Sequence, residues 1–134
     1  MDFEVAKEKA IRYLGISKKT EYEVIKKLKN LKYSDETIEK VISYLVDLGY
    51  LNDEEYIDAY IRQCVRLLNY SIYEIKMKLL QKGIKKDIIE EKLSNLENTD
   101  YEEKLIGKLL STKCKNMDSL KQKAYLYRRC LKLD

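Results

Sequence analysis

The chain has 134 residues, of which 45% are hydrophobic and 37% are charged, and it contains no proline, histidine or tryptophan. The absence of proline favours helices, because proline removes a backbone donor and clashes with the preceding helical turn. No apolar run approaches the roughly 20 residues that span a membrane. Residues 1–4 include two acidic side chains, Asp2 and Glu4, whereas a secretory signal is basic and then apolar. We therefore expect a helical, cytoplasmic protein.

The net charge of +4 is concentrated at the C-terminal end. Basic and acidic side chains number 10 and 9 in residues 1–50, 8 and 9 in residues 51–97, and 9 and 5 in residues 98–134. A local surplus of positive charge favours binding to a polyanion. It is equally typical of a solvated protein surface, so charge alone leaves both interpretations open.

The first 49 residues predict three helices. The first ends near Gly15, and its apolar face consists of Phe3, Ala6, Ala10, Tyr13 and Leu14. The second begins at a capping box, in which the side chains of Thr20 and Glu23 each cap the other's backbone N–H. Its apolar face consists of Val24, Ile25, Leu28 and Leu31. The third is capped by Ser34, and its face consists of Ile38, Val41, Ile42 and Leu45.

The segment 20–45 recurs at 71–96, aligned without gaps at an offset of 51 residues. Both copies open with a capping box, formed by Ser71 and Glu74 in the second, and both keep a turn between two helices. Gly83 occupies the second turn and suits the left-handed conformation that ends many helices. Because the pair Leu28 and Leu79 is identical in both copies, we expect the two leucines to be equivalent and buried.

A leading helix precedes the second copy, and a partial third copy follows it. Asn52 and Glu55 cap the leading helix, whose predicted buried face is Tyr56, Ala59, Tyr60, Cys64 and Leu67. A helix from Asp100 carries Tyr101, Leu105, Leu109 and Leu110 on one face, and another begins near Asp118. Residues 124–131 of this last helix align with residues 77–84.

These elements predict an all-α fold of tandem three-helix, helix-turn-helix-like repeats that form an elongated, curved array. We place the first repeat at residues 1–49, the second at residues 50–97 and an incomplete third at residues 98–134.

The sequence lacks the common catalytic and cofactor-binding motifs. It has no histidine to serve as a base and no GxxxxGK[ST], GxGxxG or GxSxG motif. Cys64, Cys114 and Cys130 are widely spaced without a CxxC pair, which indicates reduced thiols instead of zinc ligands. Acidic pairs such as Glu90 and Glu91 are typical of a solvated helix face. We expect no enzyme, no cofactor and no metal.

Two groups of residues are candidate contacts with a partner or with nucleic acid. The first lies around the turn of the second repeat and consists of Lys76, Lys78, Lys82, Lys85 and Lys86. The second lies on the last predicted helix and consists of Lys121, Lys123, Tyr125, Arg128 and Arg129. Arginine binds phosphate or carboxylate through a bidentate fork, and tyrosine adds contact area or stacks on bases. An exposed solubilising surface and simple packing of the tyrosine are the competing interpretations.

Several motifs, in order along nearly the whole chain, resemble the RecX family of recombination regulators. At the junction 48–66, LGYLNDEEYIDAYIRQCVR, the matching residues are Gly49, Tyr50, Leu51, Asn52, Asp53, Tyr56, Ala59 and Arg62. Residues 12–28 are similar to the opening of the family's first repeat. Residues 80–84 resemble the Leu-x-x-Lys-Gly-Ile turn of the second repeat, and residues 123–129 resemble the basic-aromatic helix of the third.

The resemblance implies a repeat array that lodges in the groove of a RecA–DNA filament and restrains filament growth and strand exchange. DNA phosphates are a further implied contact, and we expect a monomer. The chain departs from the family at Cys130, where the third repeat has glycine. The arginine that the second repeat has before isoleucine corresponds here to Glu74, which precedes Ile75, or to a shifted Lys76. The final helix of the third repeat is also missing. These departures bear on the strength of inhibition more than on the fold.

Two other functions fit the sequence. An autonomous DNA-binding protein is the first, since three-helix units with a sharp turn resemble helix-turn-helix domains. Neither candidate recognition helix carries a row of Arg, Asn and Gln for reading bases. The second is a helical scaffold for another protein, because a repeat array offers an extended surface. Steep salt dependence without RecA would favour the DNA binder, whereas a requirement for assembled RecA would favour the RecX-type regulator.

Overall fold

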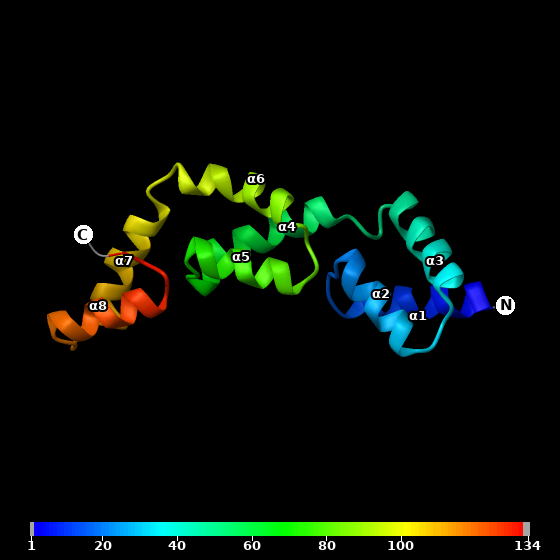
Figure 1. The fold of residues 1–134 in the computed structure, drawn as a ribbon, viewed down its shortest axis with the longest axis horizontal. Helices are drawn as coiled ribbons and strands as arrows, with labels where there is room; N and C mark the ends of the chain where they lie inside the picture. Colours follow the sequence, from blue (N-terminus) through cyan, green and yellow to red (C-terminus); the bar gives the residue numbers. More distant parts are fainter. Residues whose placement is uncertain (1, 133–134) are drawn as a thin grey trace. The chain divides into compact units, whose positions relative to one another are not determined.

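The computed structural model describes residues 2–132, which form eight α-helices and one π-helical segment and contain no β-strand. The elements, shown in Figure 1, are α1 (Asp2–Ile16), α2 (Glu21–Asn30), α3 (Asp35–Asp47), α4 (Asp53–Gln63), η1 (Cys64–Leu68), α5 (Ile72–Gln81), α6 (Lys86–Glu97), α7 (Tyr101–Ser111) and α8 (Ser119–Arg128). The prediction of an all-helical fold is confirmed. The chain divides into two compact units. Unit 1 contains the residues up to Asp58 together with Gln81–Ile84, and unit 2 contains Ala59–Leu80 together with the residues from Lys85 onward.

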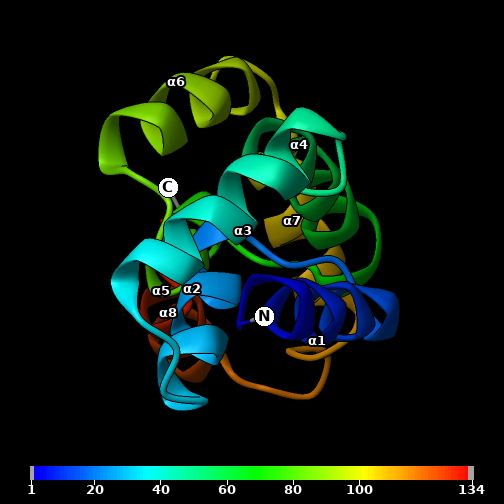
Figure 2. The same cartoon turned by 90° about the vertical axis from the view of Figure 1, so that its right-hand side faces the viewer.

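Unit 1 encloses an apolar core among α1, α2 and α3, which lie close together in Figure 2. Helix α3 packs against both α1 and α2. On α1 the two fully buried residues are Ala6 and Ala10, whose small side chains let the neighbouring helix approach closely. The other helices bury the predicted residues Val24, Leu28, Ile38, Val41 and Leu45. The predicted faces of α2 and α3 therefore form this core.

Helix starts follow the predicted caps. The Thr20 hydroxyl accepts from the Glu23 backbone N–H at 3.2 Å, and a Glu23 carboxylate oxygen accepts from the Thr20 N–H at 2.9 Å. Ser71 and Glu74 repeat this box, with distances of 3.1 and 2.8 Å. The side chains that cap α3, α4 and α8 are Ser34, Asn52 and Asp118. Local hydrogen bonding thus fixes where these helices begin.

Three equivalent helix ends use a left-handed residue. Gly83, predicted for this role, has φ +81°, and the residues aligned with it, Lys32 and Cys130, have φ +71° and +60°. The turns at Lys32 and Cys130 close when the next residue donates its backbone N–H to a carbonyl inside the helix, at 3.3 Å to Leu28 and at 2.9 Å to Leu126. Left-handed backbone costs a non-glycine residue about 1–2 kcal/mol. Two of the three turns therefore form without the residue that best suits them.

Unit 2 buries apolar residues from each of its helices. Ile75 and Leu79 of α5 and Ile89 and Leu93 of α6 are at most 1% exposed. A cluster between α7 and α8 contains Leu105, Leu109, Leu126 and Leu131. The predicted equivalence of Leu28 and Leu79 is confirmed, because both are fully buried.

Two predicted core positions are wrong. Leu67 is 70% exposed, because the backbone widens into the π-helical segment Cys64–Leu68 and its extra residue per turn rotates Leu67 off the buried face. Leu31 is 37% exposed, since α2 ends at Asn30 and the chain already turns toward Lys32. The expectation of free cysteines agrees with the structure, in which none of the three forms a disulfide.

Candidate functional site

The lysines around α5 and α6 differ in how strongly the fold engages them. Lys76 and Lys86 share one carboxylate, that of Glu90, at 3.2 and 3.8 Å. Lys78 and Lys85 are exposed, and no carboxylate within residues 2–132 lies at ion-pair distance from either. Lys78 does lie 5.8 Å from the centre of the Tyr70 ring. This predicted group therefore offers two cations whose charge no carboxylate neutralises and two that are partly neutralised.

Lys82, the fifth lysine of that group, lies in unit 1. Its ammonium group lies 3.9 Å from the Glu23 carboxylate and 5.8 Å from the centre of the Tyr56 ring. The Thr20 hydroxyl donates to the backbone carbonyl of Lys82 at 2.7 Å. Lys82 therefore contributes to the packing of unit 1, and we call its ion pair the Glu23–Lys82 contact.

The residues predicted on α8 separate into an exposed and an engaged set. Lys121, Lys123 and Arg128 are exposed, and among the described residues none has a carboxylate within ion-pair distance. Tyr125 and Arg129 instead face the interior of unit 2, where Arg129 donates to the Tyr125 hydroxyl at 2.9 Å. The two neighbouring arginines thus have different surroundings, which the sequence did not distinguish.

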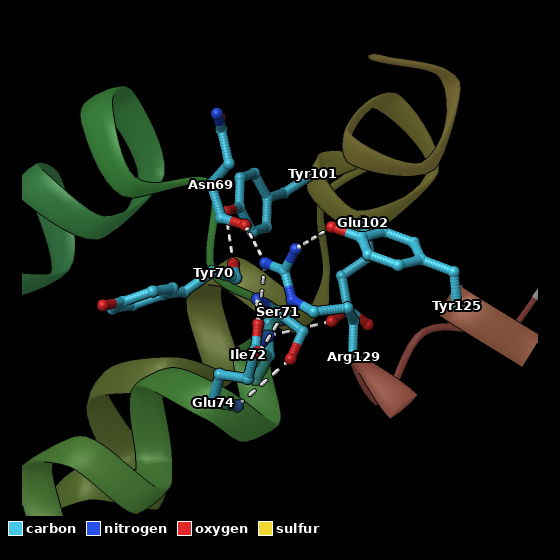
Figure 3. Close-up of polar contacts among 9 residues, drawn as sticks. All are labelled: Asn69, Tyr70, Ser71, Ile72, Glu74, Tyr101, Glu102, Tyr125 and Arg129. Atoms are coloured by element: carbon cyan, nitrogen blue, oxygen red, sulfur yellow. Dashed lines mark hydrogen bonds and ion pairs between the residues drawn. The ribbon is translucent and has the colours of Figure 1, made fainter. Parts of the chain in front are cut away.

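Arg129 is the centre of a polar cluster, drawn in Figure 3. Its Nε and Nη2 atoms donate to the two carboxylate oxygens of Glu74 at 2.8 and 3.0 Å. Nη2 also donates to the backbone carbonyl of Asn69 at 2.5 Å. The two charged side chains are only 21% and 26% exposed. We call this bidentate pair the Glu74–Arg129 clamp.

Neighbouring groups complete the hydrogen bonding around the clamp. The Ile72 N–H, free at the start of α5, donates to a carboxylate oxygen of Glu102 at 2.8 Å, and the Tyr101 hydroxyl donates to the Tyr70 carbonyl at 2.5 Å. Burial raises the pKa of Tyr101 to about 12, so this hydroxyl stays protonated near neutral pH. Burial also raises the pKa of Glu74, but hydrogen bonds from Arg129 and Ser71 outweigh that effect and lower it overall. Glu74 is therefore held as a carboxylate.

Unit 1 contains an arrangement of the same kind. The Glu21 N–H, equivalent to that of Ile72, donates to a carboxylate oxygen of Asp53 at 2.9 Å. Asp53 is the first residue of α4, and Glu102 is the second residue of α7. In both units, a carboxylate from the first turn of a later helix caps an earlier helix, and the capping-box glutamate pairs with a cation further along the chain.

Two exposed residues on α8 were not among the predicted contacts. Leu120 is 80% and Tyr127 is 81% exposed. Their spacing of seven residues, which places both on one helical face, was the available signal in the sequence.

Neither a cluster of metal-binding side chains nor a membrane-spanning helix is found among the described residues. Between residues 2 and 132, no group of three or more His, Cys, Asp or Glu side chains is placed to hold a metal ion. In the same part of the chain, every helix is too short or too polar to cross a membrane.

The two three-helix segments match known sequence families. The family description of the first three-helix domain of RecX matches residues 6–45, and that of the second matches residues 52–93, which together make up more than half of the chain. The chain belongs to the RecX family. Its two tandem three-helix domains correspond to α1–α3 and α4–α6.

Relatives named Regulatory protein RecX occur in several bacteria. The protein from Prosthecochloris aestuarii is 38% identical over 72% of this chain and 64% of its own length. Those from Clostridium beijerinckii and Clostridium perfringens are 34% and 35% identical, over 95% and 74% of this chain and 61% and 46% of their own lengths. This RecX chain thus spans between about half and just under two thirds of the length of these relatives.

Solved structures share the fold. The crystal structure of RecX from Lactobacillus salivarius superimposes with a TM-score of 0.79 and 26% identity, covering 99% of this chain and 89% of that one. A second crystal structure, of a regulatory protein RecX, has a TM-score of 0.75 over 96% of this chain and 66% of its own, and at 23% identity it supports the fold alone.

Proposed function

We propose that this protein binds the RecA–DNA filament and inhibits RecA recombinase activity in DNA repair and recombination. The observation that carries the proposal is the match of both three-helix domains to RecX, together with relatives named as regulatory proteins. We further propose that it acts without catalysis or cofactor, as a cytoplasmic monomer.

The exposed cations supply the contact with the filament. A DNA-bearing filament is a polyanion, and cations without internal partners are the ones that gain most from binding it. Among the predicted contacts in the described part of unit 2, the exposed cations without a carboxylate partner are Lys78, Lys85, Lys121, Lys123 and Arg128. Of these, Lys78 also lies 5.8 Å from the centre of the Tyr70 ring. Lys76, Lys82 and Lys86 contribute less, because nearby carboxylates already neutralise part of their charge. Tyr125 and Arg129 act by holding α8 in place.

The repeat boundaries proposed from the sequence, residues 1–49, 50–97 and 98–134, are consistent with the helix ends. The strongest support for a partial third repeat is Cys130, which adopts the same left-handed conformation as its aligned counterpart Gly83. A cap at Asp118 begins α8 ten residues ahead of Arg128, as a cap at Ser71 begins α5 ten residues ahead of Gln81.

DNA-dependent ATP hydrolysis by RecA, with and without this protein, tests the proposed function. We expect the protein to lower the rate of hydrolysis and to co-sediment with preassembled filaments. The triple variant Lys121→Glu, Lys123→Glu and Arg128→Glu should lose both effects while keeping the parent's unfolding midpoint. A matched triple reversal of exposed lysines on unit 1, at Lys18, Lys26 and Lys29, serves as the control. Unchanged hydrolysis with the parent protein would refute the proposal.

The alternative, autonomous DNA binding, is favoured by the free cations of α8 beside the exposed Tyr127 ring, since aromatic rings in basic surroundings stack on bases. Titrating a labelled single-stranded oligonucleotide without RecA at two salt concentrations tests it. Tight and steeply salt-dependent binding, with no added effect of RecA, would favour this function.

A further inference from the structure

Helix α8 has one face committed to the interior of unit 2. Leu126 is fully buried, and Tyr125 and Gln122 are partly buried beside it. Gln122 donates to the Cys114 carbonyl at 3.1 Å, and Arg129, just past the helix end, forms the clamp with Glu74. These four residues follow the spacing i, i+3, i+4 and i+7, so they form one stripe. Their contacts fix the rotation of α8 about its own axis.

The opposite face of α8 is also apolar. Leu120, Ala124 and Tyr127 are exposed and follow the spacing i, i+4 and i+7. At about 100° per residue they fall within an arc of roughly 60°, diametrically opposite the buried stripe. A surface helix that needs only one buried face is polar on the other. A second apolar stripe therefore indicates a second surface that α8 is suited to cover.

Cations border the exposed stripe on both sides. By helical spacing, Lys123 lies on one flank and Lys121 and Arg128 lie on the other. From Ser119 to Lys132 the sequence contains no acidic residue. None of the three cations has an internal carboxylate within ion-pair distance in the described chain. The stripe thus combines an apolar centre with an uncompensated positive border, and its charge complement is an acidic surface.

We infer that this face of α8, which we call the α8 stripe and define as Leu120, Lys121, Lys123, Ala124, Tyr127 and Arg128, docks an acidic amphipathic helix of a protein partner. Apolar residues at two-turn spacing match the apolar seam of a facing helix, and glutamate or aspartate beside that seam meets the flanking cations. DNA accounts for this surface less well, because phosphates need only the cations and an exposed leucine gains nothing from them. This inference rests on the proposed function and deepens it, because it assigns to α8 a contact with a protein component of the filament.

Binding of defined probes tests the inference directly. The first probe is a labelled peptide of about 14 residues, with leucines at helical i, i+3, i+4 and i+7 spacing and glutamate and alanine elsewhere. The second probe is a scrambled peptide of the same composition, in which the leucines are spread around the helix. A labelled oligothymidylate is the third probe. Fluorescence anisotropy with the full chain should show the amphipathic peptide binding about tenfold more tightly than the scrambled one.

Variants separate the apolar centre from its charged border. Leu120→Ser with Tyr127→Ser should abolish the preference for the amphipathic peptide and leave oligothymidylate binding unchanged. The matched control replaces another exposed leucine and tyrosine of unit 2, Leu67→Ser with Tyr73→Ser, which are 70% and 52% exposed. This control should keep the preference. All four side chains are exposed, so melting curves should match the parent.

Three results would overturn the inference. In the first, the parent fails to distinguish the two peptides. In the second, the Leu120 and Tyr127 variant retains the full preference. In the third, that variant loses oligothymidylate binding, which would assign the stripe to base stacking. Co-sedimentation of the parent with RecA filaments, run in parallel, keeps the two proposals apart. No co-sedimentation beside an intact peptide preference would reject the proposed function alone.

Discussion

Two capping-box glutamates, Glu23 in unit 1 and Glu74 in unit 2, occupy equivalent positions and pair with different cations. Glu23 reaches the single ammonium group of Lys82 at 3.9 Å, the outer limit of an ion pair. Glu74 meets the guanidinium fork of Arg129 with two bonds of 2.8 and 3.0 Å. The side chains of both pairs are about a quarter exposed, so the difference lies in geometry and residue type and not in burial.

In unit 1, where lysine lacks the guanidinium fork of arginine, a hydrogen bond to the backbone makes the additional contact. The buried Thr20 hydroxyl donates to the Lys82 carbonyl at 2.7 Å, so this turn is held by its main chain. In unit 2 the guanidinium of Arg129 itself bonds the Asn69 carbonyl. At this repeated position the turn is therefore held by a neutral hydrogen bond in unit 1 and by a charged side chain in unit 2. Charge-assisted bidentate bonds are the stronger and the more sensitive to substitution.

The largest expected loss of stability should be the same in both units, because it concerns equivalent leucines, each buried in the core of its own unit. Leu28→Ala and Leu79→Ala should each lower the free energy of unfolding by about 2–5 kcal/mol, since both side chains are fully buried and truncation leaves a cavity. Urea denaturation of each variant measures this loss. Two variants with the parent's midpoint would show that the assigned helix faces are wrong.

Replacing the paired cation by alanine should destabilise the protein by different amounts in the two units. Arg129→Ala should lower the free energy of unfolding by about 2–3 kcal/mol, because it leaves a partly buried Glu74 carboxylate without its bidentate partner. Lys82→Ala should cost about 0–1 kcal/mol, the range of an ordinary surface ion pair. Arg129→Lys should lose an intermediate amount, because an ammonium group lacks the fork.

A double-mutant cycle tests whether the clamp itself is responsible. Arg129→Ala combined with Glu74→Gln should be less destabilising than the sum of the two single changes, with a coupling of about 1–2 kcal/mol. The corresponding cycle of Lys82→Ala with Glu23→Gln should give a coupling close to zero. Equal coupling energies in the two units would show that the Glu74–Arg129 clamp is no stronger than the Glu23–Lys82 contact.

A smaller effect should appear at the left-handed helix ends. Cys130→Gly should stabilise the protein by up to about 1 kcal/mol, because glycine relieves the cost of φ +60° while losing some of that gain to greater freedom in the unfolded chain. Gly83→Ala should destabilise it, since a Cβ there would collide with the Tyr22 ring in addition to the left-handed backbone strain. Thermal melting compares the two, and a destabilised Cys130→Gly variant would contradict the assigned conformation.

Local signals predicted much of this structure. The capping boxes at Thr20 and Ser71 and the left-handed turn at Gly83 follow from side-chain chemistry within a few residues. The π-helical segment at Cys64–Leu68 could not be predicted, because no proline or glycine marks it. The different surroundings of Arg128 and Arg129 could not be predicted either, because no local sequence signal separates the two arginines. What separates them is a carboxylate 55 residues away from Arg129 in sequence.

The smallest expected effect is the change of stability with falling pH. Protonation of one glutamate in each unit, Glu74 and Glu21, should change the stability in opposite directions. The Glu74 pKa lies below its ordinary value of 4.5, because the bonds from Arg129 and Ser71 outweigh the effect of burial. Its stabilising contribution is therefore complete above that value and is lost as the pH falls through the folded pKa. The Glu21 pKa is raised above 4.5, first by burial and then by the nearby Asp53 carboxylate. Folding therefore favours protonated Glu21, whose ionisation costs stability at neutral pH and whose protonation in acid restores it.

Glutamine variants, which mimic the protonated side chains, make this difference measurable. At about pH 7, Glu74→Gln should destabilise the protein and Glu21→Gln should stabilise it slightly, and at about pH 3 both should approach the parent. Urea midpoints of the three proteins across this range give the test. The two curves should converge on the parent from opposite sides, because hydrogen bonds from Arg129 and Ser71 lower the pKa of Glu74, whereas burial and the nearby Asp53 carboxylate raise the pKa of Glu21. Convergence from the same side would mean that the surroundings of Glu21 and Glu74 are electrostatically alike, and the contrast between the two units would then rest on hydrogen-bond geometry alone.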